Sequence, residues 1–164
     1  MREQCKQLKS ALSYDNYRIR YGYACKALTL QAVLRVVLDE GLWIDASSIN
    51  EVHRALRAGF NPEEIYYTGE GATLDVYSYL VDRGILVSCT SIDQIRLLGA
   101  VNGKECSIRV NPGEGHGETT KTNTGGPSSK HGIYFDQVER AMAIAESLDI
   151  MLIGVHSHRI CPRH

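Results

Sequence analysis

Apolar residues along the chain follow two alternating patterns. Short runs rich in β-branched and aromatic residues predict strands, and the segments between them carry apolar residues at the spacing of a helix face. Strands are expected at about residues 17–25, 42–46, 65–68, 85–89, 106–110 and 151–155. Helical spacing marks residues 30–37, 49–56, 74–81, 92–98 and 138–145. Strands that alternate with helices predict βαβ units and therefore a parallel sheet.

One segment interrupts this alternation. Residues 111–134 hold six glycines and two prolines, which predicts a long flexible loop. A loop of this length inside a compact domain is usually functional or disordered.

The spacing of the units favours a barrel over an open, doubly wound sheet. The units are nearly uniform in length, and no Gly-x-Gly-x-x-Gly sequence follows the first strand. A complete (β/α)8 barrel takes about 250 residues. We therefore expect residues 1–164 to form one partial α/β barrel domain with about six parallel strands.

Composition excludes several functional classes. The chain is 43% hydrophobic and 23% charged, with a formal net charge of -1, as in ordinary soluble globular proteins. No basic run suggests a nucleic-acid partner. No segment approaches the about 20 apolar residues that cross a membrane, and the polar N-terminus lacks a signal-peptide core, so a cytoplasmic location is expected. The five cysteines are odd in number and form no Cys-x-x-Cys pair, which indicates reduced thiols.

Lys26 is the first candidate for chemistry, because it ends the first expected strand. Catalytic residues of barrels lie where strands end. Gly22 and Ala24 share its side of the strand and would leave room for a bound ring. Burial would make the lysine amine lose its charge more easily, which Schiff-base chemistry needs. On position alone, a surface lysine that caps the strand is the better interpretation.

Two charged residues lie near the ends of other strands. Asp45 ends the second expected strand, and Arg109 lies near the end of the fifth. In a barrel both would point toward one rim, where charge-assisted hydrogen bonds could hold a site in shape. Without the fold, two unrelated charges are the better interpretation.

Histidines gather toward the end of the chain. His156 and His158 are two residues apart on the last expected strand and would share a face, while His116 and His131 lie in the long loop. The tail reads His-x-His-x-x-Cys-x-x-His, but this spacing fits no familiar structural zinc motif, so no metal is expected. A histidine that contacts a ligand at the strand end is the preferred hypothesis, and a plain core histidine is the alternative.

The same loop could also bind an anion. The glycines of residues 113–117 and 124–126 could cradle it with backbone N–H groups, although turn formation explains them equally well.

Taken in order, seven segments carry a resemblance to a known family. They are Tyr-Ala-Cys-Lys-Ala at 23–27, Asp-Ala-Ser-Ser-x-x-Glu at 45–51, Ala-Gly-Phe-x-Pro at 58–62, Ile-Tyr-Tyr-Thr at 65–68, Ile-Arg-Val-Asn-Pro at 108–112, Thr-Gly-Gly-Pro-Ser-Ser-Lys-His-Gly-Ile at 124–133 and Gly-Val-His-Ser-His at 154–158. Together they resemble the diaminopimelate decarboxylase family of barrel-type (fold-type III) pyridoxal-phosphate-dependent decarboxylases. The resemblance to ornithine decarboxylase or alanine racemase is weaker.

This resemblance implies a cofactor, a reaction and roles for named residues. Lys26 would hold pyridoxal 5'-phosphate covalently, and His158 would stack on the ring face. Asp45 and Arg109 would line the cofactor pocket. The full-length family decarboxylates meso-2,6-diaminopimelate to L-lysine and CO2, in lysine biosynthesis, and works as a homodimer. Glu51, Lys130 and His131 match motif positions, with roles that the resemblance does not fix.

The chain departs from the family pattern after His158. The family continues with Ile-Gly-Ser, whereas this chain reads Arg-Ile-Cys-Pro-Arg-His. In the family, the phosphate loop, the acidic partner of the pyridine nitrogen, the last barrel strands and a C-terminal β-domain come later, and an additional strand comes before the barrel. We therefore expect a truncated chain that is inactive alone, with a divergent tail at 159–164. The alternative is a non-catalytic remnant or a pyridoxal-phosphate-binding module.

Overall fold

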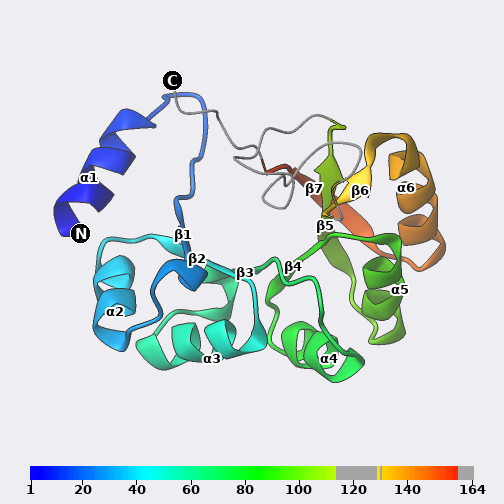
Figure 1. Cartoon of the computed structure of the whole chain (residues 1–164), viewed down its shortest axis with the longest axis horizontal. Coiled ribbons are helices and arrows are strands. Elements are labelled where there is room, and N and C mark those ends of the chain that lie inside the picture. Colours follow the sequence, from blue (N-terminus) through cyan, green and yellow to red (C-terminus); the bar gives the residue numbers. More distant parts are fainter. Residues whose placement is uncertain (114–128, 130, 159–164) are drawn as a thin grey trace. The chain divides into compact units, whose positions relative to one another are not determined.

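The computed structural model describes residues 1–113, 129 and 131–158, and it confirms the predicted alternation of strands and helices (Figure 1). The helices are α1 (Arg2–Ala11), α2 (Gln31–Asp39), α3 (Ile49–Ala58), α4 (Leu74–Asp82), α5 (Ile92–Ala100) and α6 (Val138–Ser147). The strands are β1 (Gly22–Ala24), β2 (Trp43–Ala46), β3 (Ile65–Tyr67), β4 (Leu86–Cys89), β5 (Glu105–Asn111), β6 (Ile133–Tyr134) and β7 (Met151–His156). No helix among the described residues is long and apolar enough to cross a membrane.

The chain divides into two compact units. The first holds Met1–Ala72 and Asp82–Ile85, and its strands β1, β2 and β3 pair in parallel. The second holds Thr73–Val81 and the described residues from Leu86 onward. In it β5 lies between β4 and β7, and β6 pairs with the end of β5, all in parallel. The predicted α/β class with a parallel sheet is confirmed.

Alternation along the strands gives each unit an apolar core. In the first unit Ile44, Ala46, Ile65 and Tyr67 are buried, and α3 contacts both β2 and β3. In the second unit the buried strand residues include Val87, Cys89, Cys106 and Ile108, and α5 and α6 pack on each other. The neighbouring positions on β2, β4 and β5 include Asp45, Ser88, Ser107 and Arg109. Because side chains alternate across a strand, these polar residues occupy the opposite face.

Helix α3 begins and ends with local signals that the sequence carries. The Ser48 hydroxyl accepts a hydrogen bond from the Glu51 backbone N–H at 3.4 Å. The Glu51 carboxylate in turn accepts one from the Ser47 N–H at 2.9 Å. The helix ends at Gly59, whose φ of 107° is a left-handed conformation that glycine adopts without strain. These contacts fix the segment that directly follows β2.

The structure differs from the prediction at the N-terminus. Residues 17–21 form no regular element, and the first strand begins at Gly22. Before it lies α1, a helix that the apolar pattern did not predict, because Cys5 is its one buried residue. Residues 133–134, expected within the long loop, form the short strand β6, so the described residues hold seven strands and not six.

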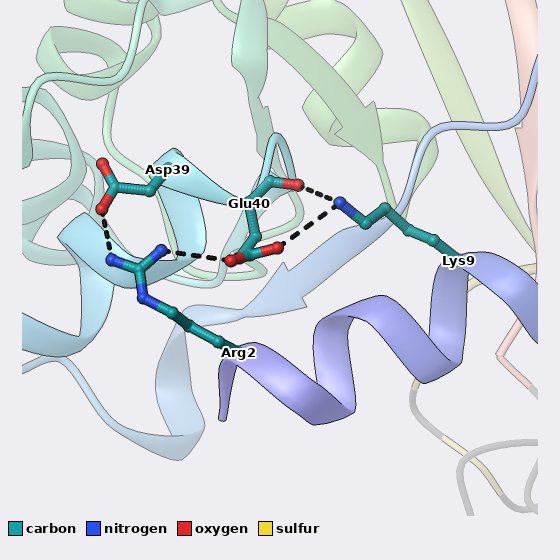
Figure 2. Close-up of polar contacts among 4 residues, drawn as sticks. All are labelled: Arg2, Lys9, Asp39 and Glu40. Carbon is teal, nitrogen blue, oxygen red and sulfur yellow. Dashed lines mark hydrogen bonds and ion pairs between the residues drawn. The ribbon is translucent and has the colours of Figure 1, made fainter.

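Charged contacts hold α1 against the end of α2 (Figure 2). The Arg2 guanidinium lies 2.6 Å from the Asp39 carboxylate and 3.1 Å from that of Glu40. The Lys9 amine donates a hydrogen bond of 2.7 Å to the Glu40 backbone carbonyl and lies 3.7 Å from its carboxylate. Cations at the C-terminal end of a helix also interact favourably with the helix dipole. Polar docking of this kind leaves no apolar stripe in the sequence.

Candidate cofactor-binding site

Lys26 lies just beyond the C-terminal end of β1, in the short 3-10 turn Cys25–Ala27. The expectation that it ends the strand is wrong by two residues. Cys25 takes the inward position and is fully buried, whereas the Lys26 side chain is exposed, in agreement with the surface position preferred from the sequence. Among the described residues none forms a hydrogen bond or ion pair with the Lys26 amine. The amine is therefore accessible at the end of a parallel strand.

The environment of Cys25 shows which charges surround this turn. Burial raises the pKa of the Cys25 thiol to about 11, and the negative charges of Glu51 and Asp45 act in the same direction. The Arg54 charge opposes them. The thiol next to Lys26 is therefore neutral at neutral pH, and it does not compete with the amine as an ionised nucleophile.

Asp45 is held in place by a residue of the next strand. Its β2 position pairs in register with Ala24 of β1 and Tyr66 of β3. The Thr68 hydroxyl donates a hydrogen bond of 2.6 Å to the Asp45 carboxylate. The Thr68 backbone N–H donates to the Ala46 carbonyl at 2.8 Å and fixes the end of β3 beside the end of β2. The structure thus brings Lys26 and Asp45 to the same edge of one small sheet.

Glu51 has a structural role in this geometry. Its carboxylate accepts hydrogen bonds from the Ser47 N–H and the Ser48 hydroxyl, so it holds the turn that leads into α3. A Ser-x-x-Glu sequence before an apolar run is a signature of a helix start. The Ser-x-x-Glu motif therefore indicated the start of α3, although the sequence left the role of Glu51 open.

In the second unit, Arg109 lies inside β5, two residues before its end, and is half-buried. It pairs in register with His156, the last residue of β7. The expectation that His156 and His158 share a strand is wrong, because β7 ends at His156. His158 lies two residues beyond and is exposed. Arg109 and the histidine segment thus meet at one end of the β5–β7 pair.

A further contact on this face was not anticipated from the sequence. The Ser88 hydroxyl of β4 lies 3.1 Å from His156 Nδ1, so the contact reaches across β5. Ser88, Ser107 and Gly154 are register partners on three adjacent strands. The alternation of side chains along each strand indicates which residues share a face. The register between the strands is also needed to identify which of them make contact.

Other predicted positions are settled only in part. His131 is half-buried, and its backbone N–H donates to the Ser129 hydroxyl at 3.3 Å. His116, Lys130, Cys161 and His164 lie outside the described residues, as do most of the glycines proposed to bind an anion. Within residues 1–113 and 131–158, no three potential metal ligands form a cluster.

Comparison with known proteins bears on this geometry. The family model described as "pyridoxal-dependent decarboxylase, pyridoxal binding domain" matches residues 1–159. The diaminopimelate decarboxylase of Escherichia coli is 36% identical over 158 residues, which are 93% of this chain and 37% of that protein. The enzyme of the same name from Methanothermobacter thermautotrophicus is 36% identical over 96% of this chain and 37% of its own length.

Solved structures agree with these relatives. A crystal structure of diaminopimelate decarboxylase matches with a TM-score of 0.84 and 32% identity, over 96% of this chain and 38% of that one. The Helicobacter pylori diaminopimelate decarboxylase, complexed with L-lysine, matches in fold with a TM-score of 0.86 at 22% identity, over 96% and 42%. The predicted α/β barrel-type fold is thereby confirmed. This chain spans little more than a third of the length of the curated relatives named here. It belongs to the family of pyridoxal-binding domains of pyridoxal-dependent decarboxylases.

Proposed function

We propose that this chain is the cofactor-binding part of a pyridoxal-phosphate-dependent amino-acid decarboxylase that converts meso-2,6-diaminopimelate to L-lysine and CO2. One observation carries the cofactor assignment. The exposed Lys26 amine stands at the C-terminal edge of β1, within a motif that resembles the cofactor-lysine motif of this family. The substrate assignment is supported by the relatives, which are named diaminopimelate decarboxylase.

The residues of the first unit fit an aldehyde cofactor. A primary amine is needed to attach it, and Lys26 supplies one that has no partner among the described residues. Gly22 leaves open space on β1, since a Cβ added there would meet no atom within 4 Å. Pyridoxal phosphate, once bound, supplies an electron sink for the bond to the departing carboxylate. The protein has to attach, orient and shield it.

Four residues share these tasks in the proposal. Lys26 attaches the cofactor, and Asp45 presents a carboxylate whose direction Thr68 fixes. The resemblance assigns Arg109 to the lining of the cofactor pocket, where it would supply a permanent positive charge. It assigns His158 to the face of the ring. Lys26 and His158 are the proposed catalytic residues, because both would touch the cofactor.

Reduction with borohydride tests the attachment. The chain is mixed with pyridoxal phosphate, reduced, digested and analysed by mass spectrometry. The cofactor mass should appear on the peptide that contains Lys26, and the Lys26→Ala variant should lose it. Lys6→Ala is the matched control, because Lys6 is also exposed and lies outside the proposed site. Equal labelling of Lys26→Ala and the unmodified chain would contradict the proposal.

The substrate requires a separate assay. The protein is isolated from its native cell at whatever length it occurs there, and CO2 release is measured with meso-diaminopimelate, L-ornithine and L-arginine. Release from meso-diaminopimelate alone is expected, from an assembly of two copies. A preference for either of the other two would overturn the substrate assignment. For residues 1–164 alone we expect cofactor uptake without turnover.

A further inference from the structure

The polar face of the second unit is organised around His156. One row of register partners crosses β4, β5 and β7 and consists of Ser88, Ser107 and Gly154. Two residues further along β5 and β7, Arg109 pairs with His156. The His156 ring reaches back to Ser88, with 3.1 Å between Nδ1 and the hydroxyl oxygen. A Cβ added at Gly154 would lie 3.6 Å from the Ser107 Cβ, so the row beneath the ring holds only small side chains. This leaves space for the ring to cross β5.

Burial makes the contact selective. Ser88 is fully buried, and a buried hydroxyl is normally hydrogen-bonded. An imidazole nitrogen can form this hydrogen bond in one of two ways: Nδ1 accepts from the hydroxyl, or Nδ1–H donates to it. Either tautomer can make this contact, and in both cases it selects one orientation of the ring. A histidine that merely fills space would have no such preference.

The position of His156 links this contact to the residues that follow β7. His156 is the last residue of β7, and strand pairing stops there. His158 follows two residues later with no regular structure. A tie from the end of β7 across β5 to the buried Ser88 limits how far the following residues can move. The Ser88–His156 contact therefore acts on the chain segment that carries His158.

We propose that His156 is a positioning residue, held by Ser88 in one ring orientation, which orients the His158 segment for the cofactor. The cofactor part rests on the proposed function, since it requires that His158 covers the ring. The structural part, the tie itself and its effect on residues 157–158, stands without it. The two parts therefore have separate readouts.

Ser88→Ala tests the tie, because it removes the hydroxyl with little change in volume. Ser107→Ala is the matched control, since Ser107 is also buried and lies in the same row. In the isotopically labelled chain, nuclear relaxation of the His156 ring reports how firmly its orientation is held, and backbone relaxation reports the order of residues 157–158. Ser88→Ala should lower the order of both, and Ser107→Ala should change neither.

Variants of the histidine keep the test decisive if Ser88→Ala folds poorly. His156→Asn retains a polar group near the Nδ1 position, and His156→Leu does not. Order at residues 157–158 should survive the first substitution and fall with the second. Equal order in both, or an unchanged order of the His156 ring in folded Ser88→Ala, would overturn the proposal.

Pyridoxal phosphate affinity supplies the second readout. A lost hydrogen bond corresponds to about a threefold to tenfold weaker binding, which we expect for Ser88→Ala and His156→Leu. Unchanged affinity in variants with lowered order overturns the cofactor part. If the unmodified chain binds no cofactor, the proposed function fails, and the measurement of ring order still decides the structural part.

Discussion

The Thr68 hydroxyl lies 2.6 Å from the Asp45 carboxylate, at the adjoining ends of two parallel strands. A hydroxyl that donates to an ionised carboxylate at this distance makes a strong, charge-assisted hydrogen bond. The carboxylate is thus oriented by the fold itself, before any ligand arrives. Sites held in this way need less rearrangement when they bind.

Replacing Thr68 by valine should weaken both stability and cofactor binding. Valine keeps the shape of the side chain but leaves the Asp45 carboxylate without its donor, a loss of about 1 kcal/mol in the free energy of unfolding. Urea denaturation followed by circular dichroism measures it. Thr68→Ser retains the hydroxyl and is the control. A valine variant as stable as the serine variant would show that the contact contributes nothing.

Gly69 should not tolerate a larger residue. A Cβ there would collide with the Tyr67 ring and would lie 2.8 Å from the Ser47 carbonyl. Overpacking of this kind costs about 1–3 kcal/mol, so Gly69→Ala should lower the urea midpoint. Gly71→Ala is the control, because a Cβ there meets no atom within 4 Å. Equal midpoints for the two variants would disprove the close approach.

Acidification should release α1 from α2. The hydrogen bond from Arg2 holds the pKa of the Glu40 carboxyl below its usual value, helped by the charges of Lys6 and Lys9. A lowered folded-state pKa stabilises the contact above the unfolded value of about 4.3, and this stabilisation disappears as pH falls through the folded value.

Hydrogen exchange of residues 2–11 at a series of pH values measures this release. Protection should decrease below about pH 4. In Glu40→Gln the carboxyl is absent, so protection should be lower at neutral pH and its decrease on acidification smaller. A Glu40→Gln variant with the pH profile of the unmodified chain would rule out Glu40 as the origin of the effect.

Cys25 should resist alkylation in the folded chain. Burial raises the pKa of its thiol to about 11, so little thiolate forms at pH 8, and the side chain is also inaccessible. Iodoacetamide labelling, located by peptide mass, should be at least about 100-fold slower than in urea. The raised pKa also stabilises the fold below the unfolded value, and this contribution is lost as pH rises toward 11. Rapid labelling at pH 8 without denaturant would show that the Lys26 turn opens.

Most of the parallel architecture was predictable, because buried strands and packed helices leave periodic apolar positions. Helix α1 left no such pattern, since Arg2 and Lys9 dock it through charges supplied by a distant part of the chain. The strand β6 has two residues and exists through its pairing with β5. The apolar pattern within a single segment does not indicate the distant segment with which it pairs.

The candidate site was predictable by residue type and only partly by position. The sequence correctly indicated that Lys26 and Asp45 lie near strand ends in the first unit. It could not find the contacts of Thr68 or Ser88, because each depends on the register between strands. The roles assigned to Lys26, Asp45, Arg109 and His158 stay predictions that the experiments above address.

The division of each sheet into an apolar and a polar face also affects how such a chain can evolve. Ile44 and Ile65 are register partners that pack in the core, while Asp45 follows Ile44 on the same strand and projects from the other side. A substitution at a polar-face position can alter ligand preference while the core keeps its packing. Related sequences can therefore diverge in specificity at little cost in folding, provided that the pairing register is preserved.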